Sequence, residues 1–161
     1  RAYTLRCHRR MDPEMEEFEL DIVARTCANR HLRQAARVVT RAYDRVLAPT
    51  GLKSTQFSLL AATTRMGPRS ITELADILGL ERSTLSRNLK LMEKEGLIRV
   101  SPEGYKRSRR VEVTPEGRKR LEQALPYWKR AQGDVVRKLG SERFLELRDL
   151  LAELGGVVSP P

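Results

Sequence analysis

The chain has 161 residues, 40% of them hydrophobic and 32% charged, and its formal net charge is +10 at pH 7. This length supports one compact domain with a real core and is too short for two domains of ordinary size. The positive charge favours an anionic partner, with nucleic acid as the first candidate and an anionic membrane surface as the second. The alternative is a basic surface that has no specific partner.

Residues 1–13 are predicted to form a disordered leader, because the first ten carry four arginines without hydrophobic periodicity and Met11 fits a natural start. Without those four charges the net charge stays at about +6, so the basic character does not depend on the leader. No apolar run approaches the ~20 residues that span a bilayer, and the N-terminus has no signal-peptide core. We therefore expect a cytoplasmic protein without a membrane partner.

A long helix is predicted from about Glu14 to Ala48. Apolar residues recur there at steps of three and four, which is the spacing of one helical face. These residues are Ala28, Leu32, Ala35, Val39, Ala42 and Val46. Pro49 and Gly51 end this helix, and a second helix follows from Ser54 or Thr55 to Met66.

A helix–turn–helix is predicted next. Ser70 and Glu73 form a capping-box pattern at the start of a short helix, and Gly79 ends it, because glycine permits the left-handed backbone of a sharp turn. The following helix runs from about Arg82 to Glu95. Its expected buried face consists of Leu85, Leu89 and Met92.

The opposite face of the 82–95 helix is rich in hydrogen-bond donors and has no carboxylate before Glu93. It consists of Arg82, Ser83, Ser86, Arg87 and Lys90. A helix face that is merely solvated usually mixes charges of both signs. We therefore predict that this face contacts base edges or phosphates, with plain solvent exposure as the alternative.

Residues 97–101 and 109–113 are predicted to pair as strands, because apolar and polar residues alternate in both segments. Five cations lie within the twelve residues from 99 to 110. They are Arg99, Lys106, Arg107, Arg109 and Arg110. A phosphate backbone would relieve their mutual repulsion and release counterions. A basic hairpin after two helices is the order of a winged helix-turn-helix, which we assign to residues 54–114 as the DNA-binding region.

Two further helices follow the hairpin. Thr114 and Pro115 suit the N-cap and first position of one helix, and Ser141 caps the last. Gly155-Gly156 and the Pro160-Pro161 tail are expected to end the fold. The fold class is therefore mainly α with a small β-hairpin wing. The terminal helices, residues 14–48 and 115–156, carry more apolar surface than the small DNA-binding region at 54–114 can cover. We therefore predict that both ends of the chain form a dimerisation region. The alternative is a monomer whose terminal helices complete its own core.

These features together resemble the MarR family of bacterial regulators (multiple-antibiotic-resistance regulators). The resemblance covers about Ala24 to Leu154. It rests on the segment 48–52 (Ala-Pro-Thr-Gly-Leu) with Gln56, on the helix-turn-helix at 70–96, on 93–98 (Glu-Lys-Glu-Gly-Leu-Ile), and on 111–117 (Val-Glu-Val-Thr-Pro-Glu-Gly).

The resemblance implies a homodimeric repressor that binds a palindromic operator in double-stranded DNA and is released by a small ligand or by oxidation. In the family, residues like Ser83, Thr84, Ser86, Arg87 and Lys90 meet the major groove and nearby phosphates, and a wing arginine like Arg107 enters the minor groove. Arg82, Lys106 and Arg109 complete the predicted DNA contacts. The family's ligands lodge between the dimerisation helices and the reading domain, and we expect a small aromatic or phenolic compound there.

The chain departs from the family pattern at two positions. Tyr105 stands where the family often has an aspartate, two residues before Arg107, and it cannot hold a charged partner as that acid does. Glu81 stands where a capping aspartate is frequent. Its longer side chain makes it a poorer N-cap for the reading helix.

Cys27 is a candidate redox site, because organic-hydroperoxide sensors of the family carry a reactive cysteine in the first helix. Alignment on Gln56 places that cysteine nearer Asn29, so the alternative is a small buried hydrophobe. Cys7 and Cys27 form no disulfide framework. Cys27 and His31 could share a metal, but a structural zinc site needs four ligands, so no metal or cofactor is expected.

An enzyme and an architectural DNA-binding protein are the two alternatives from other functional classes. An enzyme is not expected, because the sequence has no phosphate-binding glycine loop, no metal quartet and no nucleophile–base pair. An architectural DNA-binding protein without a sensor is the other alternative. A repressor should prefer one palindrome over random DNA by roughly 10³ or more, whereas an architectural protein should not.

Overall fold

The computed structural model describes residues 13–101 and 109–158, with side chains described between residues 20 and 156 of those ranges. Two compact units can be distinguished, residues 1–39 and residues 40–161. The predicted leader lies outside the described residues except for Pro13, where the first helix begins.

The first unit contains α1 (Pro13–Thr26) and the first part of α2 (Ala28–Leu47). The prediction of one continuous helix from 14 to 48 was wrong, because the helix is interrupted at Cys27.

At this interruption, side chains instead of backbone amides are the hydrogen-bond partners of two backbone carbonyls. The Arg30 guanidinium donates to the carbonyl of Ala24, and the His31 ring lies 2.9 Å from the carbonyl of Arg25. In an uninterrupted helix these two carbonyls would accept bonds from the amides four residues further on. Because the carbonyls have side-chain partners instead, the irregular backbone at Cys27 leaves them satisfied.

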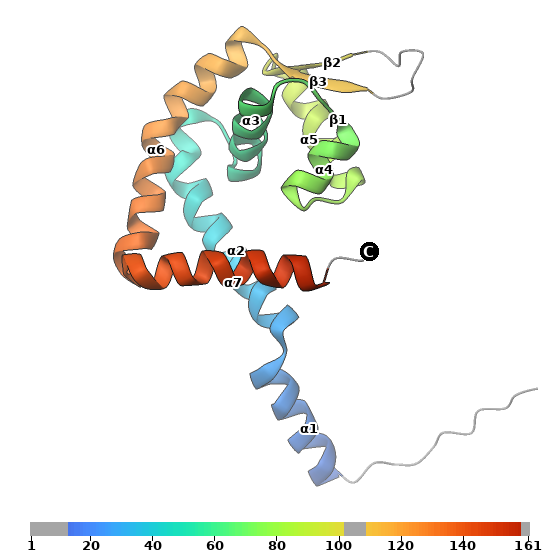
Figure 1. Cartoon of the computed structure of the whole chain (residues 1–161), viewed down its shortest axis with the longest axis vertical. Helices are drawn as coiled ribbons and strands as arrows, with labels where there is room; N and C mark the ends of the chain where they lie inside the picture. The colour runs from blue at the N-terminus through green and yellow to red at the C-terminus, as the bar shows by residue number, and fades with distance from the viewer. Residues whose placement is uncertain (1–12, 102–108, 159–161) are drawn as a thin grey trace, which may run out of the picture. The chain divides into compact units, whose positions relative to one another are not determined.

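The second unit contains the rest of α2 and the remaining elements (Figure 1). These are the 3-10 turn η1 (Ala48–Thr50), α3 (Ser54–Met66), β1 (Arg69–Ser70), α4 (Ile71–Leu78), α5 (Arg82–Lys94), β2 (Ile98–Val100), β3 (Arg110–Val113), α6 (Pro115–Leu139) and α7 (Ser141–Val158). The strands form an antiparallel sheet in the order β1-β3-β2. The predicted fold class, mainly helical with a small β wing, is confirmed.

The two predicted wing strands are present but shorter than expected. Ile98 lies opposite Val113 and Val100 lies opposite Val111, and all four face inward, whereas the residues between them are exposed. β1 was not predicted, because two residues are too few to show alternation. It pairs with β3 and joins the start of the helix-turn-helix to the wing.

The predicted start and end of the first helix of the helix-turn-helix are confirmed. The Ser70 hydroxyl accepts a bond from the Glu73 amide at 3.2 Å, and the Glu73 carboxylate accepts one from the Ser70 amide at 2.8 Å. Gly79 adopts φ 60°, the left-handed conformation that the turn between α4 and α5 requires.

The last helix, α7, continues through Gly155 and Gly156 to Val158, two residues beyond the predicted bound at 156. Glycine inside a helix costs only about 1 kcal/mol relative to alanine, so two glycines can continue a formed helix.

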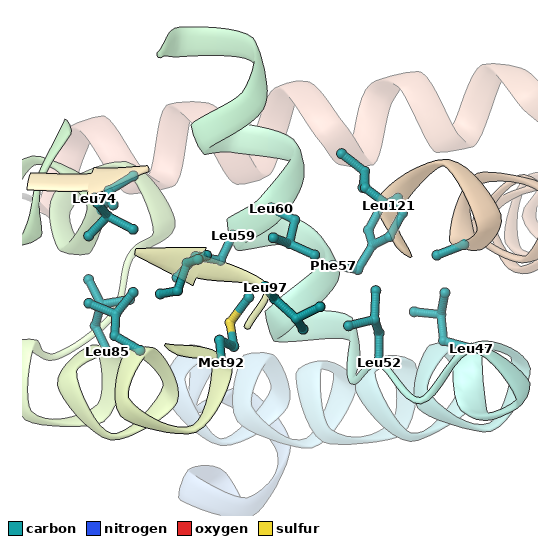
Figure 2. Close-up of a cluster of buried hydrophobic side chains, with 14 of the residues drawn as sticks. Leu47, Leu52, Phe57, Leu59, Leu60, Leu74, Leu85, Met92, Leu97 and Leu121 are labelled. Carbon is teal, nitrogen blue, oxygen red and sulfur yellow. The ribbon is translucent and has the colours of Figure 1, made fainter. Parts of the chain in front are cut away.

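A single apolar core joins the elements of the second unit. Figure 2 shows it as a band that runs from Leu74 and Leu85 at the helix-turn-helix to Leu47 and Leu121 at the other end. Phe57 of α3 stacks on Trp128 of α6, with the ring centroids 5.9 Å apart.

Three polar contacts join α2, η1, α3 and α6 within the second unit. The Tyr43 hydroxyl of α2 donates to Gln132 of α6 at 2.7 Å. The next residue, Asp44, accepts a bond from the amide of Ser54 at 2.7 Å and so caps the start of α3. These adjacent residues fix the end of α2 to two helices at once. Arg120 of α6 also donates to the carbonyl of Thr50 in η1 at 3.3 Å.

Gly117 should be irreplaceable at the start of α6. A Cβ at this position would lie 2.0 Å from the carbonyl oxygen of Leu97, whereas a Cβ at Gly133, in the same helix, would meet nothing within 4 Å. We expect Gly117→Ala to lower the free energy of unfolding by about 1–3 kcal/mol or more, and Gly133→Ala to raise it by up to about 1 kcal/mol. Urea unfolding at one protein concentration measures both, and equal stability of the two variants would contradict the packing at Gly117.

Candidate DNA-binding surface

The predicted reading face of α5 is turned away from the core. Leu85, Leu89 and Met92 are 0%, 3% and 0% exposed, which fixes the rotation of the helix about its axis. The predicted contact residues lie on the other side. Arg82, Ser83, Arg87 and Lys90 are exposed, and Thr84 and Ser86 are half-buried.

Arg87 is held by its own helix. Its guanidinium donates to the hydroxyl of Thr84 at 3.3 Å, one turn earlier. This contact leaves other guanidinium N–H groups available, because arginine carries five donors. Glu81 is the N-cap of α5 and makes no side-chain capping bond, as expected from the length of its side chain.

A small hollow of about 40 Å³ separates α5 from the base of the wing. It brings together three predicted contact residues, Ser86 and Lys90 of α5 and Arg109 of the wing. Ile71, Leu89, Glu93 and Val100 complete its lining. The predicted contacts Lys106 and Arg107 lie outside the described residues.

Glu93 is a site residue whose role the sequence did not reveal. Its carboxylate accepts a hydrogen bond from the amide of Val100 in β2 at 2.9 Å, which ties the last turn of α5 to the wing. The only signal in the sequence was a lone carboxylate on a basic helix face. Its partner is a backbone amide, so no residue type marked the pair.

The wing base is also tied to α4. The amide of Ile71 donates to the carbonyl of Arg109 at 3.3 Å, beside the pairing of β1 with β3. The Ser101 hydroxyl accepts a bond from the Arg110 amide at 2.9 Å and closes the end of the strand pair. The first residues of the wing are therefore hydrogen-bonded both to the start of α4 and across the strand pair.

Glu73 carries the clearest electrostatic perturbation at this surface. The Ser70 hydroxyl, the Ser70 amide and the nearby guanidinium groups of Arg69 and Arg110 hold the pKa of its carboxyl below the usual value of 4.5. The ionised carboxylate thus supports the start of α4.

Cys27 lies at the break between α1 and α2, half-buried and without a disulfide. The Tyr43 hydroxyl of α2 donates to Gln132, and partial burial raises its pKa. The Nε2 of His31 already has a hydrogen-bond partner in the carbonyl of Arg25. Among the residues that the structure describes, no three His, Cys, Asp or Glu side chains are grouped so that they could hold a metal ion.

Within the ranges 13–101 and 109–158, no helix combines the length and the apolar character needed to cross a membrane.

Comparison with known proteins identifies the class. The sequence model of the MarR family matches residues 50–108, a range that includes α3, β1, the helix-turn-helix and β2. The uncharacterized HTH-type transcriptional regulator YwoH of Bacillus subtilis is 32% identical over 99 residues, which cover 59% of this chain and 72% of YwoH.

Two solved structures extend the likeness. MosR, a transcriptional regulator of M. tuberculosis solved in complex with DNA, is 41% identical, with 81% of this chain and 95% of MosR covered and a TM-score of 0.73. CouR, a transcriptional repressor solved with bound p-coumaroyl-CoA, is 25% identical, with 80% of this chain and 91% of CouR covered and a TM-score of 0.70. The chain belongs to the MarR family and is a DNA-binding transcriptional regulator.

The Glu73 carboxylate should make stability depend on acid pH. Because its pKa is lowered in the folded state, its contribution is present above the unfolded pKa and is lost as the pH falls through the folded pKa. We expect wild type to be more stable than Glu73→Gln at pH 7, with the difference shrinking as the pH falls below 4.5. Glu122→Gln, an exposed change on α6, is the control. A Glu73→Gln difference that stays constant as the pH falls would contradict this role.

Proposed function

We propose that the protein is a homodimeric repressor that reads a palindromic operator through α5 and its wing and is released by a small ligand. The observation that carries the proposal is the reading face of α5, which presents cations and hydroxyls to solvent while its opposite face is buried. MosR, 41% identical, has been solved in complex with DNA, which supports the same mode here. The named relatives are regulators, which supports a function that is not enzymatic.

The DNA contacts are proposed residue by residue. Arg87 and Lys90 reach base edges and phosphates in the major groove, since arginine and lysine are the usual partners of guanine. The remaining α5 contacts are Arg82, Ser83, Thr84 and Ser86. Arg109 meets the backbone at the wing base, and Lys106 and Arg107 belong to the wing between the described ranges. Phosphate contacts fix the register, and base contacts supply the sequence preference.

Exposed apolar side chains on the terminal helices support the homodimer. In α7, Leu145, Leu147, Leu150 and Leu151 are 42–56% exposed. The first unit exposes a similar set, Leu20, Ile22, Val23, Leu32, Val38 and Val39. A patch of exposed apolar side chains usually marks an interface. A second copy would cover it and would place two α5 helices about one DNA turn apart.

A hollow on α6 supports ligand release. It measures about 280 Å³ and is lined by Pro126, Tyr127 and Arg130. The Arg130 guanidinium lies 5.6 Å from the centre of the Tyr127 ring. An aromatic acid could pair its carboxylate with Arg130 and its ring with Tyr127. CouR, whose solved structure holds p-coumaroyl-CoA, is an example of a structural neighbour with an aromatic acyl ligand.

Oxidation of Cys27 is the second candidate trigger, because this half-buried thiol lies where the helix is interrupted. Oxidation of this side chain would act on backbone that already departs from helical geometry. Release of bound DNA by an organic hydroperoxide, reversed by a thiol reductant and absent in Cys27→Ser, would support this trigger over a small ligand.

Selection of genomic DNA fragments by the purified protein tests the proposed function. We expect one inverted repeat to be preferred over a scrambled duplex by roughly 10³ or more at a fixed salt concentration. Equal affinity for both duplexes would contradict a repressor and indicate an architectural DNA-binding protein.

Arg87→Ala should weaken the sequence-specific part of binding. We expect a loss of about 1–3 kcal/mol on the selected operator if Arg87 pairs with one base through two hydrogen bonds, and a smaller loss on scrambled DNA. Fluorescence anisotropy with both duplexes measures this. Lys129→Ala, which removes an exposed positive charge from α6, is the control. If the operator and the scrambled duplex lost affinity equally, Arg87 would not read a base.

A further inference from the structure

The outer edge of the wing has a specific hydrogen-bonding problem. β2 is an edge strand, because the sheet order is β1-β3-β2. The backbone groups of Leu97 and Ser101 pair with Thr114 and Arg110 on the β3 side. In an antiparallel pair alternate residues point their backbone groups to opposite sides, so the Val100 amide points away from β3. An edge amide of this kind is free for water or for another strand.

The reading helix supplies the partner of this amide. Glu93 lies three and seven residues after Lys90 and Ser86, on the same side of α5, and its Oε1 accepts the Val100 amide at 2.9 Å. A one-turn shift of the wing along α5 would break this bond. The contact therefore links the direction of β2 to that of the helix that meets the major groove.

The position of Glu93 is unfavourable for DNA affinity in itself. The carboxylate lines the same hollow as Lys90 and Arg109, two cations proposed to meet phosphates. A negative charge there weakens the attraction of this surface for DNA. A role in geometry accounts for a carboxylate at a place where charge alone would disfavour one.

We propose that Glu93 is a positioning residue that sets the wing relative to α5, so that Arg109 and the reading face reach the same stretch of duplex together. This proposal rests on the proposed function, since it assumes that α5 and the wing bind one DNA segment. It goes beyond that function by assigning the joint between the two contact elements to one side chain.

A comparison of Glu93→Ala with Glu93→Gln tests the proposal, because both remove the charge and only glutamine keeps an acceptor for the Val100 amide. We expect Glu93→Ala to bind the selected operator roughly threefold to tenfold more weakly than Glu93→Gln, the size set by one hydrogen bond. Circular dichroism and urea unfolding show whether both variants are folded. Equal affinity of the two variants would overturn the proposal.

A double-mutant cycle with Arg109→Ala gives the second readout. If Glu93 positions the wing, Arg109→Ala costs less affinity in the Glu93→Ala background than in wild type. In Glu95→Ala, which removes the same charge two residues away, Arg109→Ala should cost as much as in wild type. Equal costs in all three backgrounds would overturn the positioning role.

The cycle can be measured on scrambled duplex as well as on the operator. A wild-type protein without operator preference would therefore overturn the proposed function and would still report whether Glu93 and Arg109 are coupled. The two failures are thus distinguishable.

Discussion

Burial of one face of α5 determines where the polar face of this helix points. Leu85, Leu89 and Met92 are almost completely buried, and burial of each contributes about 1.5–3 kcal/mol. Like charges one turn apart on a helix cost only about 0.2–0.5 kcal/mol per pair. The apolar face therefore decides how the helix is turned, and the core tolerates the crowding of cations on the opposite face.

The proposed release mechanism needs a connection between α6, where the hollow lies, and the domain that holds α5. The end of α2 provides this connection. Tyr43 and Asp44 are consecutive residues, yet one bonds to α6 and the other caps α3. The hollow at Tyr127 and Arg130 lies on the same α6 that bears Gln132. In this mechanism, a ligand that displaces α6 acts on α2 and, through the cap on Ser54, on the domain that holds α5.

Most of the fold could be predicted from the sequence because its elements are marked by local chemistry. The capping box at Ser70, the left-handed Gly79 and the alternation of Val111 and Val113 depend on neighbours along the chain. The break at Cys27, the strand β1 and the wing anchor Glu93 depend on hydrogen bonds between side chains and backbone groups, or on pairing with distant strands. No pattern of residue types in the sequence predicts such bonds. The end of α7 could not be predicted either, because glycines can either end or continue a helix.

In the proposed function, two copies of the chain present their α5 helices to one duplex. The most direct measurement is the mass of the protein–DNA complex in solution, by light scattering or analytical ultracentrifugation, on a duplex that carries one selected inverted repeat. We predict a pair of chains on each duplex, together with a dimer in the absence of DNA. A complex with a single chain on each duplex, formed by a protein that is monomeric alone, would contradict the account.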